Sequence, residues 1–394
     1  PVILARQDQA QSELTDYYQA LAIAHLLKQG DDYELKPDEP RVKLTKQGQQ
    51  RLEEILAEIH NGWNLPQAEK LTLMALRALH ILQRDRDYLV KDNAIELIDD
   101  NTGRRVPDRS WQKGLQQLIE CKEGCALSSE KTVLARISFQ RFFRRYLHLG
   151  GMSATLSEAA GELKRTYGLK VIRIPTRKPV RRKMLPERVY PRAASKWPII
   201  VKRIEKIHHK GRPILVGTRS IRDSEYLSLL LEKAGLPHQV LNARQDEQEA
   251  MVIAKAGKRG QITIATNMAG RGTDIRLLTE ARKAGGLHVI ALELNDARRI
   301  DRQLYGRSAR QGNRGSCEAI VSLDDAIFES VALPVRTWLQ KWLKSYRHLP
   351  VWLGRLLIRW AQWRKQQAYV KLRYRLLKWD QQQDKTLAFT GRRE

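Results

Sequence analysis

The stretch Ile264–Ile275, IATNMAGRGTDI, joins a short apolar run to residues whose types could contact a charged ligand. Gly270 and Gly272 would let the backbone approach a ligand closely, because glycine adopts dihedral angles that other residues avoid. Arg271 and Asp274 add a cation and a carboxylate to the same loop. This spacing is equally typical of a tight strand-to-helix turn with a surface ion pair, so other segments must decide between the two.

A second segment, residues 298–312, has the sequence RRIDRQLYGRSARQG and is predicted to be helical. It carries Gln303, Arg307 and Arg310, and Gln311 follows them. Arg307 and Arg310 are three residues apart and would share one helical face. Two arginines directed at one point suit the spread negative charge of a phosphoryl-transfer transition state.

A third motif, Ser153, Ala154 and Thr155, lies upstream of both segments. Motor ATPases use a Ser-Ala-Thr tripeptide to link a nucleotide site to a second domain. Three residues alone could match by chance. The order of the three motifs along the chain is the one expected for such motors, and the ordered set predicts a nucleotide-driven motor.

These motifs lie among strand-like runs that alternate with helical stretches from Ile95 onwards. The runs are AIELID, LKVIRIP, RPILVG, HQVLN, QITIAT, LHVIAL and CEAIVSL. Such alternation predicts a parallel sheet with crossover helices, and ligands of such sheets bind at the carboxyl ends of the strands. The loop after QITIAT has that position. Residues 1–90 have a different texture, typical of a small α+β domain.

Composition limits the remaining possibilities. A chain of 394 residues suggests two or three domains. It has 71 Lys and Arg against 44 Asp and Glu, so its net charge is +27, which favours a polyanionic partner over the alternative of simple solubility. The three cysteines are too few for a disulfide framework and fit a reducing cytosol, and their spacing predicts no metal site.

The chain resembles the SecA preprotein translocase ATPases, which are built on the motor core of superfamily-two helicases. The likeness runs almost continuously from residue 1 to about residue 330. It is carried by TIATNMAGRGTDI, GGLHVI, RRID-x-QL-x-GRS-x-RQG, ILVGT-x-SI-x-x-SE, VLNA and VKD-x-x-I-x-x-ID-x-x-TGR. The resemblance implies an α/β fold of RecA-like parallel-sheet motor domains, with an inserted α+β clamp domain and a helical C-terminal segment.

The same resemblance implies four parts. Residues 1–90 would be the preprotein cross-linking domain, a clamp that closes on unfolded polypeptide. Residues 91–160 would be the C-terminal part of the first RecA-like nucleotide-binding domain, and residues 161–330 the second. Residues 331–394 would form a basic, Trp-rich, scaffold-like tail.

The resemblance also assigns roles to single residues. Arg307 and Arg310 would be catalytic arginine fingers that reach the γ-phosphate of ATP. The nucleotide would be bound by Gly270, Arg271, Gly272, Asp274 and Gln311. Coupling between domains would involve Ser153, Ala154, Thr155 and Gln303. The expected cofactors are ATP and Mg²⁺, with the metal ligands outside this chain.

The sequence departs from the family pattern at several places. It contains no G-x-x-x-x-G-K-[ST] phosphate loop, and it begins with Pro1, so it reads as part of something longer. The family's NAK-x-H is replaced by residues 242–246, NARQD, and Ala309 stands where GRSGR has glycine. The short C-terminal end suggests a compact SecA-like variant. We therefore expect this chain alone not to turn over ATP.

The tail, residues 331–394, holds 15 Lys and Arg, 3 acidic residues and six of the nine tryptophans. One interpretation packs these tryptophans against the motor as a scaffold. The other places Trp352, Trp360 and Trp363 on one side of a helix that contacts a membrane surface or a channel.

Three functions remain open. The first is an ATP-driven protein translocation motor, cytoplasmic and peripheral on the inner face of the bacterial cell membrane. Its partners would be unfolded preprotein, a SecYEG-like protein-conducting channel and acidic phospholipids, with nucleic acid not expected as substrate. The second is a superfamily-two nucleic-acid helicase, which the net charge of +27 would suit. The third is an inactive fragment.

Overall fold

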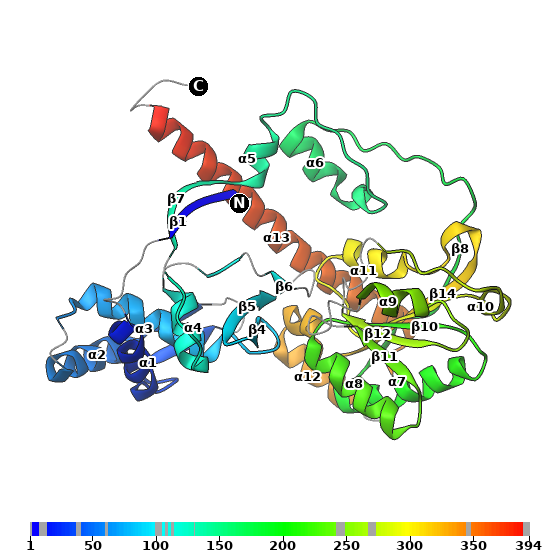
Figure 1. Ribbon diagram of the computed structural model, residues 1–394, viewed down its shortest axis with the longest axis horizontal. Coiled ribbons are helices and arrows are strands. Elements are labelled where there is room, and N and C mark those ends of the chain that lie inside the picture. The colour runs from blue at the N-terminus through cyan, green and yellow to red at the C-terminus, as the bar shows by residue number, and fades with distance from the viewer. Residues whose placement is uncertain are drawn as a thin grey trace. The chain divides into compact units, whose positions relative to one another are not determined.

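The computed structural model describes residues 2–7, 14–36, 41–59, 62–98, 105–106, 109–111, 114–129, 131–241, 249–266, 273–343 and 348–388. The chain divides into two compact units, which are described separately (Figure 1). The clamp unit comprises residues 3–100 and 105–136. The motor unit comprises residues 137–394 together with residues 1–2 and 101–104.

The clamp unit is an α+β structure built from four helices and short antiparallel strand pairs, as far as its residues are described. The helices are α1 (Leu14–Leu26), α2 (Lys46–Ile59), α3 (Leu65–His80) and α4 (Leu115–Glu123). The antiparallel strands are β2 (Tyr33–Lys36), β3 (Arg41–Leu44), β4 (Tyr88–Lys91), β5 (Ala94–Ile98) and β6 (Arg105–Val106). A further pair joins β1 (Val2–Gln7) to β7 (Lys131–Ile137).

Two local features of this unit follow from its residue types. Asp92 and Asn93 both have positive φ, 51° and 59°, as a two-residue hairpin turn between β4 and β5 requires. Thr45 caps α2, because its hydroxyl oxygen accepts a hydrogen bond from the Gly48 amide at 3.0 Å. A Cβ at position 48 would lie 1.9 Å from the Asp32 carbonyl oxygen, so a Glu or Gln of a full capping box would not fit there.

The structure places the limit of the clamp unit near residue 136, whereas the sequence suggested residue 90. Two contacts explain the difference. The run AIELID forms β5, which pairs with β4 as an antiparallel hairpin and takes no part in the parallel sheet. Helix α4 then packs against α1 and α3, and its Leu118 and Ile119 are fully buried in their shared core.

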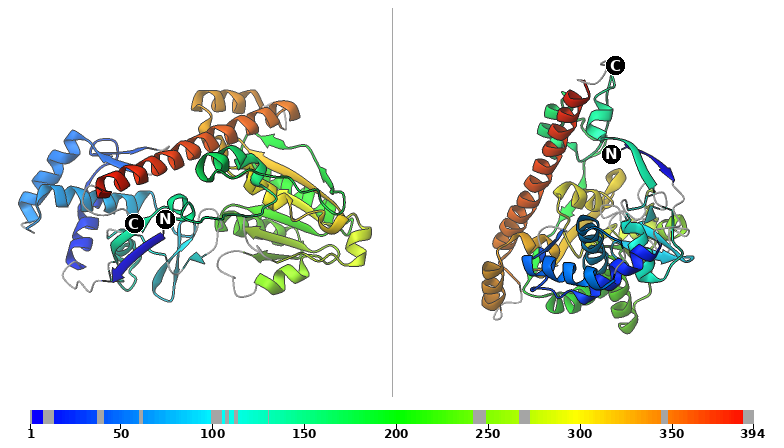
Figure 2. Two further views of the ribbon diagram at one scale, coloured as in Figure 1. Left: turned by 90° about the horizontal axis from the view of Figure 1, so that it is seen from above. Right: turned by 90° about the vertical axis from the view of Figure 1, so that its left-hand side faces the viewer.

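The motor unit is organised around a seven-stranded parallel sheet, as predicted. The strand order is β11-β12-β10-β13-β14-β8, and β9 also pairs with β14. The strands are β8 (Arg181–Met184), β9 (Arg188–Tyr190), β10 (Ile214–Thr218), β11 (His238–Leu241), β12 (Ile262–Thr266), β13 (His288–Ala291) and β14 (Arg314–Ser322). Figure 2 shows the sheet between its helices.

Alternating residues of the central strands fill two separate cores. Val216, Ile264 and Ile290 pack on the face covered by α7 (Ala193–His208) and α8 (Ile221–Lys233). Leu215 and Val289 pack on the opposite face. That face is covered by α9 (Glu249–Lys255), α10 (Thr279–Lys283), α11 (Arg298–Tyr305), α12 (Leu333–Trp342) and α13 (Val351–Ala388). A sheet buried on both faces explains the continuous apolar runs in these strands.

One predicted strand is absent, and two were missed. The run LKVIRIP forms no strand, and Ile172 and Ile174 are 82% and 84% exposed because no described strand pairs with them. Strands β8 and β9 were missed because Arg181–Met184 is strongly basic and Arg188–Tyr190 is short.

The helix α13 runs from the sheet to the segment that follows the clamp unit (Figures 1 and 2). Its Ile358 and Ala361 are buried in the sheet core, and Gly354 lies against Val189. Further along, the Arg373 guanidinium binds the Glu162 carboxylate of α6 (Ala160–Tyr167) with distances of 2.5 and 2.9 Å. Among the described helices, none is both long and apolar enough to cross a membrane.

Candidate functional site

The predicted ligand-binding loop, within Ile264–Ile275, follows β12, as predicted, but its centre lies outside the described residues. Gly270, Arg271 and Gly272 belong to residues 267–272, so their predicted contacts stay predictions. The description resumes at Thr273. Asp274 is half-exposed and begins the crossover that leads to α10 and β13.

Both predicted arginine fingers turn toward this crossover. The Arg310 Nη1 atom lies 2.8 Å from Asp274 Oδ1, and Arg310 Nε donates to the Gly306 carbonyl at 3.0 Å. Arg307 Nη1 donates to the Thr273 carbonyl at 3.3 Å. The structure thus brings together a carboxylate and two arginines that lie more than 30 residues apart in the sequence.

The exposure of the Arg310–Asp274 pair matters for its chemistry. The two side chains are 41% and 42% exposed, and exposed ion pairs contribute only about 0–1 kcal/mol to stability. A phosphate oxygen could therefore replace the Asp274 carboxylate as the partner of Arg310 at little cost. Arg310 is therefore able to exchange the Asp274 carboxylate for a phosphate group, and the geometry supports a phosphate-binding site.

The prediction that Arg307 and Arg310 share one helix is wrong. Helix α11 ends at Tyr305, Arg307 lies in the turn that follows, and Arg310 begins a short 3-10 segment, Arg310–Gly312, that leads into β14. Ala309 and Gln311 have φ of 58° and 55°, so the chain cannot continue as a right-handed helix.

Tight packing holds this turn in place. The Ser308 hydroxyl donates to the Leu287 carbonyl at 2.9 Å, and Arg182 binds the Ser308 carbonyl with two donors. A Cβ at Gly315 would lie 2.2 Å from Ser308 Oγ, so only glycine allows this approach. Non-glycine residues with positive φ persist where the surroundings enforce them, and they gather at functional sites.

The Ser-Ala-Thr motif is joined to α11 through a residue that the sequence did not indicate, Arg302. Arg302 donates to the Ala154 carbonyl at 3.3 Å and to the Glu158 carboxylate at 3.1 Å. Ser153 and Thr155 bond to each other through their hydroxyls at 3.2 Å. Gln303, the predicted coupling residue, is the neighbour of Arg302. Only the fold could reveal this contact, because about 145 residues separate its partners.

The start of α11 is fixed by a buried carboxylate. Asp301 accepts hydrogen bonds from the Asn295 amide at 2.9 Å and from the Gln362 side chain of α13 at 2.6 Å. Burial raises the pKa of Asp301 to about 7, although these donors oppose the shift. Helix α13 therefore holds the arginine-bearing segment at its beginning.

A second, largely buried carboxyl group, Glu293, lies just after β13. Burial, together with the hydrogen bond and the charge of Asp223, raises the pKa of Glu293 to about 8. Asp325 and Lys196 are nearby, and Lys196 Nζ lies 2.7 Å from Asp325 Oδ1. Glu293 therefore keeps its proton near neutral pH.

The described residues hold no group of three or more His, Cys, Asp or Glu side chains that could bind a metal ion. Asp274, the carboxylate of the candidate site, is paired with Arg310. This donor set does not fit Mg²⁺, which prefers several oxygen ligands. The arginines fit the phosphate groups of a nucleotide.

Two family models match the chain. The SecA preprotein cross-linking domain matches residues 12–120, and the SecA P-loop domain matches residues 179–283 and 278–343. The second match contains Asp274, Arg307 and Arg310. The chain belongs to the SecA family.

Curated relatives agree with this assignment. The chain is 44% identical over 397 aligned residues to a protein named Protein translocase subunit SecA 3 of Magnetococcus marinus, and this match covers all of the chain and 60% of the relative. It is 46% identical to Protein translocase subunit SecA 2 of Bordetella avium, over 95% of the chain and 57% of the relative. The chain spans about three-fifths of the length of these SecA relatives.

Among solved structures, that of the yeast DEAD-box splicing factor Prp28 is 17% identical, with a TM-score of 0.33. The similarity covers 52% of this chain and 44% of that one. It is too low to carry any conclusion on function.

Proposed function

We propose that this SecA chain supplies the preprotein clamp and the second RecA-like half of an ATP-driven protein translocation motor. The motor would couple ATP hydrolysis between two RecA-like domains to the movement of unfolded preprotein across the bacterial cytoplasmic membrane. The observation that carries the proposal is the meeting of Arg307, Arg310 and Asp274 within the P-loop-domain match. The cross-linking-domain match over residues 12–120 supports polypeptide as the substrate.

In this proposal Arg310 acts by exchanging partners. Bound nucleotide would draw the guanidinium from Asp274 to the γ-phosphate, where negative charge spreads in the transition state. Arg307 would assist from the same turn. Gly270, Arg271, Gly272, Asp274 and Gln311 would line the nucleotide. ATP supplies the phosphoryl group whose transfer to water drives the motor.

Coupling would pass through α11. The Ala154 carbonyl of the Ser-Ala-Thr motif accepts a hydrogen bond from Arg302 on this helix, and the arginine turn follows the end of the helix. A shift of the turn on ATP binding would therefore be transmitted through α11 to the Ser-Ala-Thr segment. Gln303 is proposed to act with Arg302 in this link.

Catalysis would need residues that this chain does not contain. None of its 394 residues forms a G-x-x-x-x-G-K-[ST] motif, whose lysine and backbone amides hold the β- and γ-phosphates and whose hydroxyl binds Mg²⁺. We therefore expect the purified chain alone to show no magnesium-dependent ATP turnover above background. A longer protein that contains a phosphate-loop domain as well should be active.

The expected partners follow from the family. Unfolded preprotein would bind the clamp, and the motor would work at a SecYEG-like channel while acidic phospholipids hold it peripherally on the inner face of the cell membrane. A net charge of +27 also suits nucleic acid, so a helicase is the competing function.

Stimulated hydrolysis separates the two functions. A protein as long as the SecA relatives, containing both this chain and a phosphate-loop domain, should hydrolyse ATP faster when unfolded polypeptide and acidic lipid are added. Single-stranded RNA of equal charge is the matched control and should have little effect. Stimulation by RNA alone would favour the helicase and contradict the proposal.

A further inference from the structure

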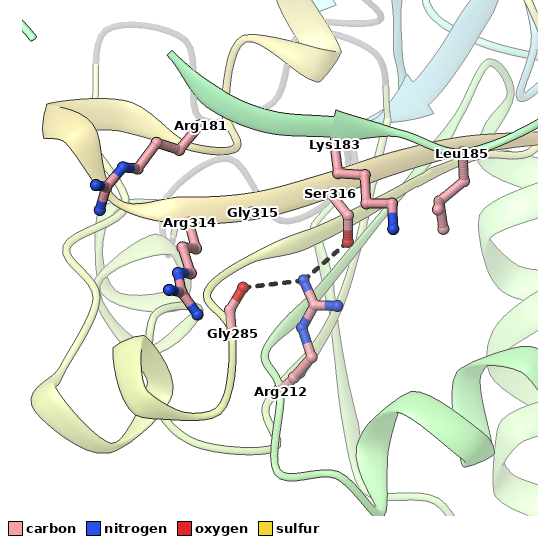
Figure 3. A pocket seen from close by; sticks show the side chains of 8 residues that line it. All are labelled: Arg181, Lys183, Leu185, Arg212, Gly285, Arg314, Gly315 and Ser316. Carbon is pink, nitrogen blue, oxygen red and sulfur yellow. Dashed lines mark hydrogen bonds between the residues drawn. The ribbon is translucent and has the colours of Figure 1, made fainter. Parts of the chain in front are cut away.

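A second cation-lined site lies at the amino ends of the strands, apart from the Arg310–Asp274 pair. A pocket of about 560 Å³ is surrounded by Arg181, Lys183, Arg212 and Arg314 (Figure 3). Arg212 precedes β10, and Arg314 is the first residue of β14. Arg182 lies between Arg181 and Lys183 but is directed to the Ser308 carbonyl, away from this pocket.

Arg212 is held rigidly in the pocket. Its Nε donates to the Gly286 carbonyl at 3.1 Å, and its Nη2 donates to the Gly285 carbonyl at 3.2 Å and to Ser316 Oγ at 2.8 Å. These bonds use one edge of the guanidinium and leave the Nη1 donors for a ligand, as far as the described residues show. Gly285 has φ of 109°, a conformation that favours glycine and brings its carbonyl to Arg212.

The remaining cations are brought together by strand pairing. Arg181 on β8 is the register partner of Arg314 on β14, and Lys183 is the partner of Ser316. Arg181, Lys183 and Arg314 are exposed, and none of them forms an ion pair with a described carboxylate. Like charges on neighbouring strands repel each other, so this arrangement costs stability unless an anion lies between them.

The nearby carboxylate does not neutralise the pocket. Glu318, further along β14, accepts hydrogen bonds from Arg203 at 2.6 Å and from His288 at 2.8 Å. Burial and the charge of Arg203 lower the pKa of Arg212, and the charge of Glu318 opposes this shift. Because Glu318 is bound to Arg203 and His288, the cations that line the pocket leave it positively charged.

We propose that this pocket binds a phosphate group, either of a free phosphate compound or of a phospholipid headgroup. Phosphate offers several negatively charged oxygens to different cations at once, and arginine forks match its geometry. Arg212 forms the fixed floor of the site, and Lys183 and Arg314 close on the ligand from the rim. The alternative role of these charges is to protect β8, an edge strand, from pairing with other chains.

The test compares one double substitution with two single substitutions in the full chain. The pocket variant combines Lys183→Ala with Arg314→Ala, which removes two exposed side chains and leaves the bonds of Arg212 intact. The control Arg222→Ala removes an exposed cation at the start of α8, beyond the carboxyl end of β10 and thus at the opposite edge of the sheet. A second control, Arg310→Ala, reports on any phosphate bound at the candidate nucleotide site.

Two probes distinguish the sources of phosphate. Calorimetric titration with inorganic pyrophosphate measures binding of a free phosphate compound. Sedimentation with phosphatidylglycerol vesicles, against phosphatidylcholine vesicles, measures headgroup binding. The pocket variant should lose affinity for one probe by about tenfold or more, because each lost charge-assisted hydrogen bond has an effect of that size.

Each outcome decides the proposal. A loss confined to pyrophosphate identifies a free phosphate compound, and a loss confined to the anionic vesicles identifies the headgroup; in both cases Arg222→Ala should bind normally, and any loss in Arg310→Ala is assigned to the candidate nucleotide site. If the pocket variant binds both probes as Arg222→Ala does, the proposal is overturned and the cations serve only to protect the edge strand. Circular dichroism of each variant confirms that the fold is retained.

Discussion

Arg310 has two bonds that suggest different roles. Its Nε is fixed by the Gly306 carbonyl, whereas its Nη1 is paired with an exposed carboxylate that a phosphate could replace. A residue held on one edge and exchangeable on the other is suited to act in the transition state. Asp274 then serves as the resting partner.

In a protein completed by a phosphate-loop domain, Arg310→Ala should slow ATP hydrolysis by about 10³-fold or more while nucleotide affinity stays nearly unchanged. The reason is that charge develops mainly in the transition state. Single-turnover kinetics and equilibrium nucleotide binding provide the two measurements. Arg298→Ala, an exposed cation on α11, is the control and should change neither. An equal loss of affinity and rate would contradict the role of Arg310.

Glu293 makes stability depend on pH. In the folded protein it keeps its proton up to about pH 8, whereas its usual pKa is 4.5. Between these values the folded state binds more protons than the unfolded state, so rising pH favours unfolding. The stabilising contribution is complete below the usual pKa and is lost as the pH rises through the folded pKa.

The free energy of unfolding of the wild type should therefore fall, relative to Glu293→Gln, as the pH is raised from about 5 to about 8. Urea unfolding followed by circular dichroism measures the difference. The amide cannot ionise but keeps the shape of the side chain. A difference that stays constant over this range would show that Glu293 has an ordinary pKa.

At the scale of elements, the sequence was sufficient for the parallel sheet. The runs RPILVG, QITIAT, LHVIAL and CEAIVSL are buried on both faces and became β10, β12, β13 and β14. The sequence was insufficient for β8, because its basic residues are not typical of a strand in a parallel sheet. It was also insufficient for LKVIRIP, whose apolar residues pair with no described strand. Whether these two segments form strands depends on contacts with distant parts of the chain.

The site shows the same division. Residue types predicted that Asp274, Arg307 and Arg310 would act at one place, and the structure brings them together. They could not predict that α11 ends before the arginines, because the turn depends on contacts of Ser308 with Leu287 and Arg182. Nor could they indicate Arg302, whose partners lie in another part of the motor unit.

The link between α11 and the Ser-Ala-Thr segment gives a prediction at this scale. Arg302→Ala removes the bonds to Ala154 and Glu158. In the completed protein, stimulation of hydrolysis by unfolded polypeptide should be largely lost, while nucleotide affinity is retained. Arg299→Ala, an exposed neighbour on α11, is the matched control and should keep normal stimulation. Full stimulation in Arg302→Ala would show that the contact is only structural.

The basic tail, residues 331–394, has both a buried and an exposed set of apolar side chains. Leu339, Leu343, Leu349, Ile358 and Ala361 are buried in the sheet core, so the tail is part of the motor unit. The tryptophans are different, since Trp338, Trp352 and Trp363 are 61%, 70% and 58% exposed. The interpretation that packs them against the motor is therefore wrong for these residues. Exposed tryptophans among 15 Lys and Arg suit the headgroup region of an acidic membrane.

Replacing Trp352 and Trp363 with Ala should weaken binding to phosphatidylglycerol vesicles, with the remaining binding reduced further by salt. The tail should not be deleted for this test, because its buried residues support the core. Co-sedimentation at low and high salt measures the effect. The control Trp197→Phe changes a tryptophan that contacts Tyr226 beside α7, away from the tail. Unchanged vesicle binding would place the membrane contact elsewhere.

If this chain is part of a motor that moves unfolded polypeptide, a transport assay should detect the movement. The completed protein is added with ATP and an unfolded preprotein to inverted membrane vesicles that carry the channel, and the amount of protease-protected preprotein is measured. We expect ATP-dependent protection that is lost in Arg310→Ala. If the protein hydrolyses ATP and binds the vesicles but the preprotein is not protected, the proposed translocation function is contradicted.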